Sequence, residues 1–196
     1  MTKQIIIIIV LIAAVAIIGS IFSFTKGPGD EGREPSLNTR KSYSNDIYGI
    51  NFEYPANYFL EEREVGTGER GHYQIMLTED TEENRRLRQG EATIAREGPT
   101  AITIDFYQNN IEKLELYKWL TETNQSNFKL SDGSYMSLTQ SGKEAVSYTW
   151  DGLYTGDTVA LLYKDNIVAL SVTYLGPDDE IRKDFKNVVL TTLTFK

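Results

Sequence analysis

Residues 143–176 constrain the fold more than any other part of this chain. Val, Ala, Leu, Tyr, Thr and Trp dominate the stretch, and these residue types suit a pleated, half-buried surface. Asp165-Asn166 tolerates the left-handed backbone of a tight hairpin, so it is the predicted turn between the last two strands. The stretch therefore predicts three consecutive antiparallel strands, at about 143–150, 158–164 and 167–174.

The last of these strands presents two uncharged faces. Successive side chains of a strand point to opposite sides, so the residues divide into two sets. One set is Val168, Leu170, Val172 and Tyr174, and the other is Ile167, Ala169, Ser171 and Thr173. Because neither set carries a charge, we expect a central strand with another layer packed on at least one side.

The N-terminal part of the chain is long and apolar enough to cross a membrane. Ile5–Phe24 is 20 residues without a charge, which as a helix would span roughly 30 Å. A signal peptide is the alternative, with Lys3 as its basic end and Ala14-Val15-Ala16 as its cleavage site. The apolar run continues for eight residues beyond Ala16, which favours an uncleaved transmembrane anchor over residues 1–25.

This anchor predicts where the rest of the chain lies. The short head with Lys3 would stay in the cytoplasm, and a single pass through the cell membrane would place the acidic remainder outside. Residues 26–44 contain Gly, Pro, Ser and mixed charge without periodicity, so they are interpreted as a flexible linker. Such a linker has a reach of about 23 Å. The globular domain is expected over 45–196, with the lipid bilayer contacted through residues 5–24.

Charge and residue usage exclude several classes of function. Residues 1–26 hold two of the 20 basic side chains and no acid, so the remainder carries a net charge of −10. That balance disfavours nucleic acid, which selects for Lys and Arg patches. The chain has no cysteine and one histidine, which removes disulfides, thiol catalysis and multi-histidine metal sites. His72 itself is expected to be an ordinary surface or hydrogen-bonded histidine.

The remaining patterns predict further strands and two amphipathic helices. Ile111–Thr123 and the segment after Gly176-Pro177 show helical spacing, and Ile181, Phe185, Val188 and Val189 form the buried stripe of the second. Residues 81–100 are either a short helix with a loop or a mobile excursion. Period-two alternation predicts strands at Tyr48–Pro55, Asn57–Val65, His72–Thr78, Ala101–Gln108 and Tyr135–Gln140. The fold class is therefore α+β, an antiparallel sheet of about 6–7 strands packed with helices.

The order of these elements resembles that of a known family. Tyr48-Gly49-Ile50-x-Phe52-x-Tyr54-Pro55 is similar to the start of bacterial members of the PsbP/Mog1-like group, and Gly142-Lys143-x-Ala145, the long hairpin and the final helix follow in that order. The resemblance covers about residues 45–196 and implies an α/β/α sandwich. Known members include a photosystem II accessory protein and a nuclear-transport factor that binds a small GTPase, while many bacterial members are membrane-tethered. These motifs concern packing, so no functional residue follows from them.

Three groups of residues are candidates for a binding site. Asp151 and Asp157 flank a loop with two glycines and could share a cation, although hairpin turn chemistry is the favoured explanation because the loop lacks the alternating oxygen ligands of a calcium site. Arg85, Arg86, Arg88 and Arg96 could bind an acidic partner, or pair internally with Glu82, Glu83, Glu91 and Glu97. Tyr154, at the predicted loop tip, is expected to be exposed and available to a partner.

These observations favour a non-catalytic protein. The leading hypothesis is a membrane-anchored extracytoplasmic interaction module, an accessory subunit that works through a protein partner. The alternative is a small-ligand or cation-binding protein that uses the loop 151–157 or a pocket between helix and sheet. No cofactor is expected, and an enzyme would have to work with carboxylates and tyrosines alone.

Overall fold

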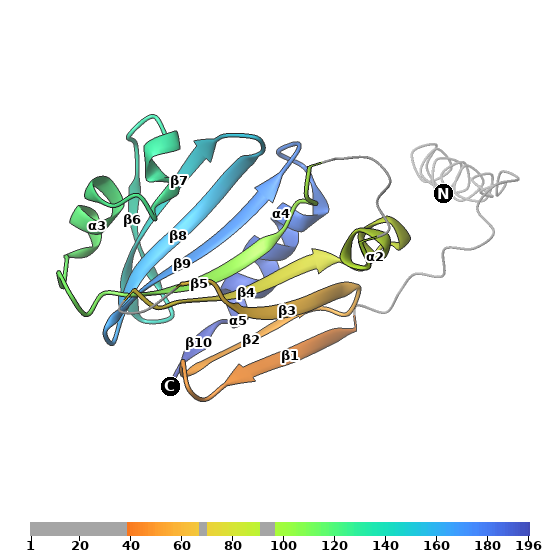
Figure 1. The fold of residues 1–196 in the computed structure, drawn as a ribbon, viewed down its shortest axis with the longest axis horizontal. Coiled ribbons are helices and arrows are strands. Elements are labelled where there is room, and N and C mark those ends of the chain that lie inside the picture. Colours follow the sequence, from red (N-terminus) through yellow and green to blue (C-terminus); the bar gives the residue numbers. More distant parts are fainter. Residues whose placement is uncertain (1–38, 67–69, 91–96) are drawn as a thin grey trace, which may run out of the picture. The chain divides into compact units, whose positions relative to one another are not determined.

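The computed structural model describes residues 39–66, 70–90 and 97–196 (Figure 1). The predicted transmembrane anchor and residues 26–38 of the predicted linker lie outside the described residues. In the part of the chain that is described, no helix is both long and apolar enough to span a membrane.

Seven antiparallel strands form the main sheet, in the spatial order β3-β4-β5-β9-β8-β7-β6 (Figure 1). This confirms the predicted α+β class and the expected number of strands. The central position of β9, between β5 and β8, is also confirmed. The strands are β3 (Tyr58–Glu64), β4 (His72–Glu79), β5 (Ile102–Gln108), β6 (Met136–Gln140), β7 (Lys143–Asp151), β8 (Thr155–Tyr163) and β9 (Asn166–Tyr174).

The turn between β8 and β9 lies one residue earlier than predicted. Tyr163 and Asn166 are paired across the hairpin, so Lys164-Asp165 forms the turn in place of Asp165-Asn166. Lys164 takes the left-handed backbone conformation, with φ of 54°. Asn166 instead belongs to the strand, because its pairing with Tyr163 and with Gln108 of β5 outweighs its turn preference.

A second, three-stranded sheet contains β1 (Arg40–Asn45), β2 (Ile50–Pro55) and β10 (Thr194–Phe195), in the order β1-β2-β10. Two expectations are corrected here. Strand β1 starts inside the range 26–44 predicted as linker, and the predicted strand β2 does not join the main sheet. Strand β1 is polar and mostly exposed, and its pairing with β2 along its whole length holds it in place. A hydrophobic pattern therefore could not reveal it.

The closing helix packs against both sheets. It runs from α4 (Glu180–Asp184) through a π-helical turn, η2 (Phe185–Val189), into α5 (Leu190–Thr192). Its predicted stripe is confirmed, since Ile181, Phe185, Val188 and Val189 are all buried. Ile181, Phe185 and Val189 join a core made by the inner faces of the two sheets. The closing helix therefore covers one face of the main sheet.

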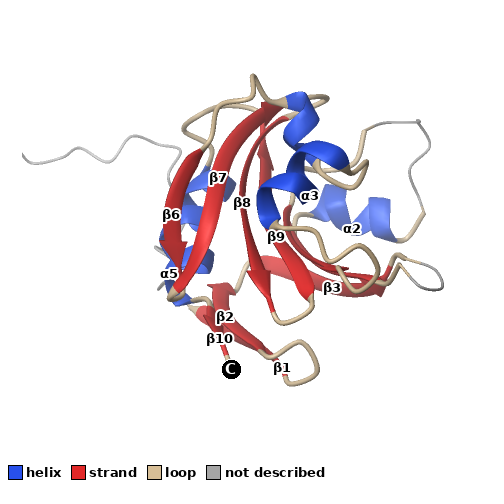
Figure 2. Cartoon of the chain, turned by 90° about the vertical axis from the view of Figure 1, so that its left-hand side faces the viewer, coloured by secondary structure: helices blue, strands red, loops and turns tan. Residues whose placement is uncertain are grey.

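The opposite face of the main sheet carries a second, smaller core. It is covered by α3 (Leu116–Glu122) and the short 3-10 helix η1 (Asn127–Leu130) (Figure 2). A further helix, α2 (Glu82–Arg88), lies outside this core and has no buried residue. It confirms the alternative of a short helix with a loop for part of the range 81–100.

Helix α3 is shorter than the predicted helix 111–123. The Asn109 side chain bonds both the N–H and the C=O of Leu114, and Lys113 has a positive φ of 46°. These features make a loop of residues 109–115. As a result Ile111 is exposed, and so is Tyr117, while Trp119 and Leu120 provide the buried surface of α3.

Candidate functional site

The face of the main sheet opposite the larger core carries polar side chains, because successive residues of a strand point to opposite faces. Ile102, Ile104 and Phe106 of β5 are buried against the closing-helix side. Their neighbours Thr103, Asp105 and Tyr107 therefore point to the opposite face. On the adjacent strand β9 the same face carries the small side chains Ala169, Ser171 and Thr173. These small side chains leave space above the centre of the sheet.

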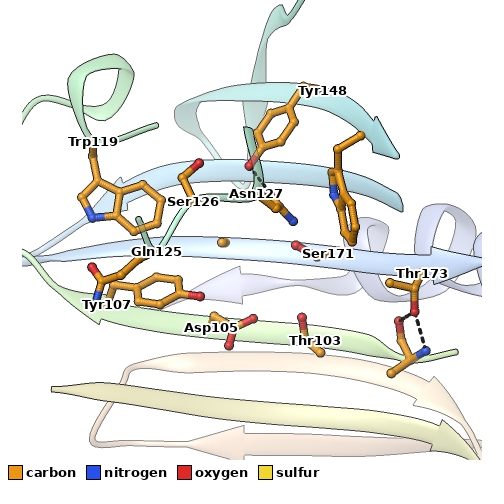
Figure 3. A pocket seen from close by; sticks show the side chains of 13 residues that line it. Thr103, Asp105, Tyr107, Trp119, Gln125, Ser126, Asn127, Tyr148, Ser171 and Thr173 are labelled. Carbon is orange, nitrogen blue, oxygen red and sulfur yellow. Dashed lines mark hydrogen bonds between the residues drawn. The ribbon is translucent and has the colours of Figure 1, made fainter. Parts of the chain in front are cut away.

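This space is a cavity of about 270 Å³ between the sheet and the chain from α3 to η1 (Figure 3). Four aromatic side chains line it. Tyr107 and Trp119 have ring centroids 5.0 Å apart. At the other end Trp150 lies flat on Gly156, where an added Cβ would come within 2.4 Å of the indole ring. The aromatic rings are Tyr107, Trp119, Tyr148 and Trp150.

Asp105 supplies a carboxylate to the cavity and is only 5% exposed. Its Oδ1 accepts a hydrogen bond from Gln74 Nε2 at 2.7 Å and lies 2.7 Å from His72 Nε2. The His72 ring also stacks on Tyr107, with centroids 4.1 Å apart. The one histidine is therefore a hydrogen-bonded residue that positions Asp105, in agreement with the expectation for it.

A hydrogen-bond network fixes the part of the cavity between η1 and β8. Tyr148 donates its hydroxyl proton to Asn127 Oδ1, and Asn127 Nδ2 donates to Thr158 Oγ1 at 3.2 Å. Thr158 Oγ1 also accepts from Trp150 Nε1 at 3.0 Å and lies 2.8 Å from Ser171 Oγ. Because these side chains hold one another, this wall is preorganised before any ligand arrives.

Burial raises the pKa of two cavity tyrosines above the ordinary value near 10. It raises the pKa of Tyr148 to about 12. Burial, together with the nearby Asp105 carboxylate and Tyr148, also raises the pKa of Tyr107. Both side chains therefore present O–H groups at neutral pH. Within the described residues the Tyr107 hydroxyl and the side chains of Thr103 and Gln125 make no hydrogen bond, so they are available to a ligand.

Asp151 and Asp157 lie outside this cavity and have different surroundings. Asp151 is exposed and accepts a hydrogen bond from Thr155 at 3.3 Å. The side chain of Asp157 is 12% exposed, and two cations contact it. Four side chains donate to its carboxylate at 2.8–3.0 Å: Thr149, Tyr174, Arg182 and Lys186. A bound cation would have to displace these donors.

The arginine group is largely paired within its own helix and the residues before it. Arg85 and Arg88 both bind Asp80, and Arg88 also stacks on the ring of Phe59 at 4.1 Å. Arg86 pairs with Glu82 at 3.2 Å, one of the internal partners expected from the sequence. Arg96 lies outside the described residues.

Tyr154 is less exposed than expected for a loop tip. It is half-buried, and its hydroxyl donates to the carbonyl oxygen of Gly98 at 2.7 Å. Leu153 takes the exposed position, with 68% of its surface accessible. The expectation that Tyr154 is fully exposed is therefore corrected, because a long-range contact that is invisible in the sequence uses its hydroxyl; its role toward a partner stays a prediction.

Sequence reasoning did not single out the residues of the cavity. The sequence patterns indicate no binding role for Asp105, Tyr107, Trp119, Tyr148 or Trp150. One signal was present, because Asp105 interrupts a strand that otherwise carries apolar or neutral side chains. A second was the run of small residues on one face of β9. Only the pairing of β5 with β9 brings these two signals together.

Comparisons with known proteins find a likeness among solved structures. No family model matches the chain, and no curated protein matches it. Among solved structures the chain is similar to cyanobacterial PsbP (CyanoP) from Synechocystis sp.. The TM-score is 0.49 at 10% sequence identity, over 87% of this chain and 100% of that chain. A likeness at this level says nothing about function.

Proposed function

We propose that this chain is a non-catalytic binding module, held at the outer side of a membrane by residues 5–24, that takes a small organic cation. One observation carries the ligand class: four aromatic rings and one buried carboxylate line the same cavity. The membrane position and the membership of the PsbP/Mog1-like family are proposed from the sequence.

The chemistry of the cavity favours an ammonium group. The face of an aromatic ring attracts a cation, and the attraction grows when the site excludes water. Asp105 adds a negative charge that is 5% exposed, where screening by solvent is weak. The net charge of −10 on residues 27–196 also favours the approach of a cation over that of an anion.

The size of the cavity limits the ligand. A volume of 270 Å³ holds about nine water-sized groups, given ~30 Å³ for each in the liquid. This corresponds to a small amino alcohol or quaternary ammonium compound. A neutral ligand that stacks on the rings, such as a monosaccharide, is the competing chemistry, and only the carboxylate distinguishes the two.

Binding without a chemical reaction is proposed because of how His72 is held. Its ring is hydrogen-bonded to Asp105 and stacked on Tyr107, and it does not line the cavity, so among the described residues no histidine faces a ligand there. Within the described residues no group of three metal-ligating side chains forms a metal site.

Calorimetry with choline and its neutral isostere 3,3-dimethylbutan-1-ol tests the ligand class. The full chain in detergent micelles should bind choline, and Asp105→Asn should weaken binding by at least about tenfold. The Asn side chain still accepts the hydrogen bonds of His72 and Gln74, so the shape of the cavity is kept. Asp151→Asn removes an exposed charge outside the cavity and is the matched control. Equal binding of both compounds, or equal loss in both variants, would show that the cavity does not select a cation.

Surface labelling tests the proposed orientation. The chain has no cysteine, so single cysteines can be placed at Thr2 and at Ile47, which is 86% exposed. In intact cells a membrane-impermeant maleimide should label Ile47→Cys but should reach Thr2→Cys only after permeabilisation. Labelling in the reverse order, or release of the domain into the medium, would contradict the tethered outer position.

A further inference from the structure

The two outer strands of the main sheet differ in how they are protected. Strand β3 carries four charges in its seven residues, Glu61, Glu62, Arg63 and Glu64. Strand β6, at the other side of the sheet, has the sequence MSLTQ and no charge. Charged side chains prevent edge strands from pairing with other chains. The β6 side of the sheet lacks this protection.

On this side β6 covers only part of β7 (Figure 2). The pairing stops at Met136 and Ser147, so within the described residues Tyr148–Asp151 has a strand neighbour only on the β8 side. In an antiparallel sheet alternate residues direct their N–H and C=O groups to each side. Two of these four residues therefore direct backbone groups away from β8, toward a position where no strand lies.

A groove with a volume of about 790 Å³ follows this open part of β7. Residues 130–136 border it on one side and the closing helix borders it on the other. We call it the β7-edge groove. Its apolar lining comes from Leu130, Met136, Leu138, Val159, Phe185 and Leu190.

Exposed apolar side chains gather at the rim of the β7-edge groove. Leu130 is 51% exposed, Tyr135 46% and Met136 71%. Tyr117, also 51% exposed, continues the patch, because its ring lies 5.3 Å from that of Tyr135. An apolar patch of this kind on a soluble domain marks an interaction surface.

The charged residues that line the groove indicate the sign of the charge on its partner. Three carboxylates line it, against two cations, Arg182 and Lys186. Both cations bind Asp157, so the lining keeps a net negative charge, and Asp132 and Asp151 are its exposed carboxylates. A partner segment with Lys or Arg complements them.

We propose that the β7-edge groove binds an extended segment of a protein partner, which adds as a strand beside Tyr148–Asp151. Main-chain hydrogen bonds would supply affinity, and alternate apolar side chains would fill the apolar lining. Lysine or arginine next to this run would meet Asp132 and Asp151. This site is separate from the proposed cation site, although Tyr148 and Trp150 line both spaces.

Selection from a phage-displayed library of short random peptides, on the full chain in detergent micelles, tests the proposal. Enriched peptides should show apolar residues at every second position with a flanking Lys or Arg. Met136→Glu should weaken the synthesised peptides by at least about tenfold. Ile47→Glu, at a position 86% exposed in the β1–β2 turn, is the matched control and should leave affinity unchanged. Both positions are exposed enough to accept the charge without unfolding.

Amide hydrogen exchange tests the strand-addition geometry directly. Peptide binding should slow exchange of the amides in Tyr148–Asp151 that point away from β8. The proposal is overturned if no peptide is enriched over empty micelles, if Met136→Glu binds as wild type, or if these amides remain unprotected. It is also overturned if the chain forms a concentration-dependent dimer that Met136→Glu dissociates, since a second copy would then occupy the groove. Choline binding by Met136→Glu is measured separately. A failure of the strand-addition proposal can therefore be distinguished from a failure of the proposed cation site.

Discussion

Asp157 shows how a single residue is determined by its neighbours in space. The sequence places it in a loop with Asp151, whereas the structure places it on β8 beneath the closing helix. Burial raises its pKa, but hydrogen bonds from Arg182, Lys186 and Thr149 outweigh burial and lower the pKa to about 2. The carboxylate therefore links the closing helix to the sheet.

Acid should weaken this link. Because the folded-state pKa lies below the unfolded value near 4, Asp157 contributes stability above pH 4, and the contribution is lost as the pH falls toward 2. The shift corresponds to about 2 kcal/mol. Asp157→Asn should destabilise the protein at pH 7 and should reduce the loss of unfolding free energy between pH 4 and pH 2.

Urea unfolding of wild type and variant at several pH values measures this effect. Some acid sensitivity will remain in the variant, because the hydrogen bond from Arg85 also lowers the pKa of Asp80 to about 2. An acid dependence that is the same in both proteins would show that Asp157 does not link the helix to the sheet.

At the scale of elements, the turn between β6 and β7 is encoded locally. Ser141 and Gly142 both have positive φ, 50° and 75°, and Gln140 pairs with Lys143 across them. Two left-handed residues form the hairpin turn that matches the twist of the strands. Glycine at the second position adopts this conformation without steric cost.

Gly142→Ala should lower the unfolding free energy by about 1 kcal/mol through backbone strain. No atom lies within 4 Å of the added Cβ, so steric overlap contributes nothing. Gly98→Ala is the matched control, since Gly98 has the same open surroundings without a left-handed backbone. Thermal unfolding of both variants measures the difference, and equal stability would argue against strain at Gly142.

Helix α3 shows where local reasoning fails at this scale. The helical spacing of apolar residues extends back to Ile111, yet the helix begins at Leu116. The Asn109 side chain closes a loop around Leu114, and this competes with helix formation. The loop in turn sets where Trp119 enters the cavity, so the site depends on a hydrogen bond that no periodicity reveals.

At the scale of the whole molecule, the main sheet carries different chemistry on its two faces. One face joins the closing helix and the smaller sheet in the larger core, and the other supports the smaller core and the cavity. Strand β9 contributes to both, with Val172 fully buried on the first face and Ser171 in the cavity on the second.

Val172→Glu should prevent folding, because it places an unpaired charge at the centre of the larger core, at a cost of about 5 kcal/mol or more. Circular dichroism and limited proteolysis measure the outcome. Leu175→Glu, three residues later and 79% exposed, should fold normally. A folded Val172→Glu protein would mean that β9 is not the central strand.

Residues close in the chain encode the antiparallel meander of β7, β8 and β9, the buried stripe of the closing helix and the Ser141-Gly142 turn. These follow from local rules, since alternation, helical spacing and turn chemistry depend on residues close in the chain. Tertiary structure decided the site. Asp105 meets the small residues of β9 only through strand pairing, Asp157 meets Arg182 only when the closing helix docks, and β1 exists only because β2 pairs with it. Contacts between distant residues depend on the packing of the whole chain, and no local pattern encodes them.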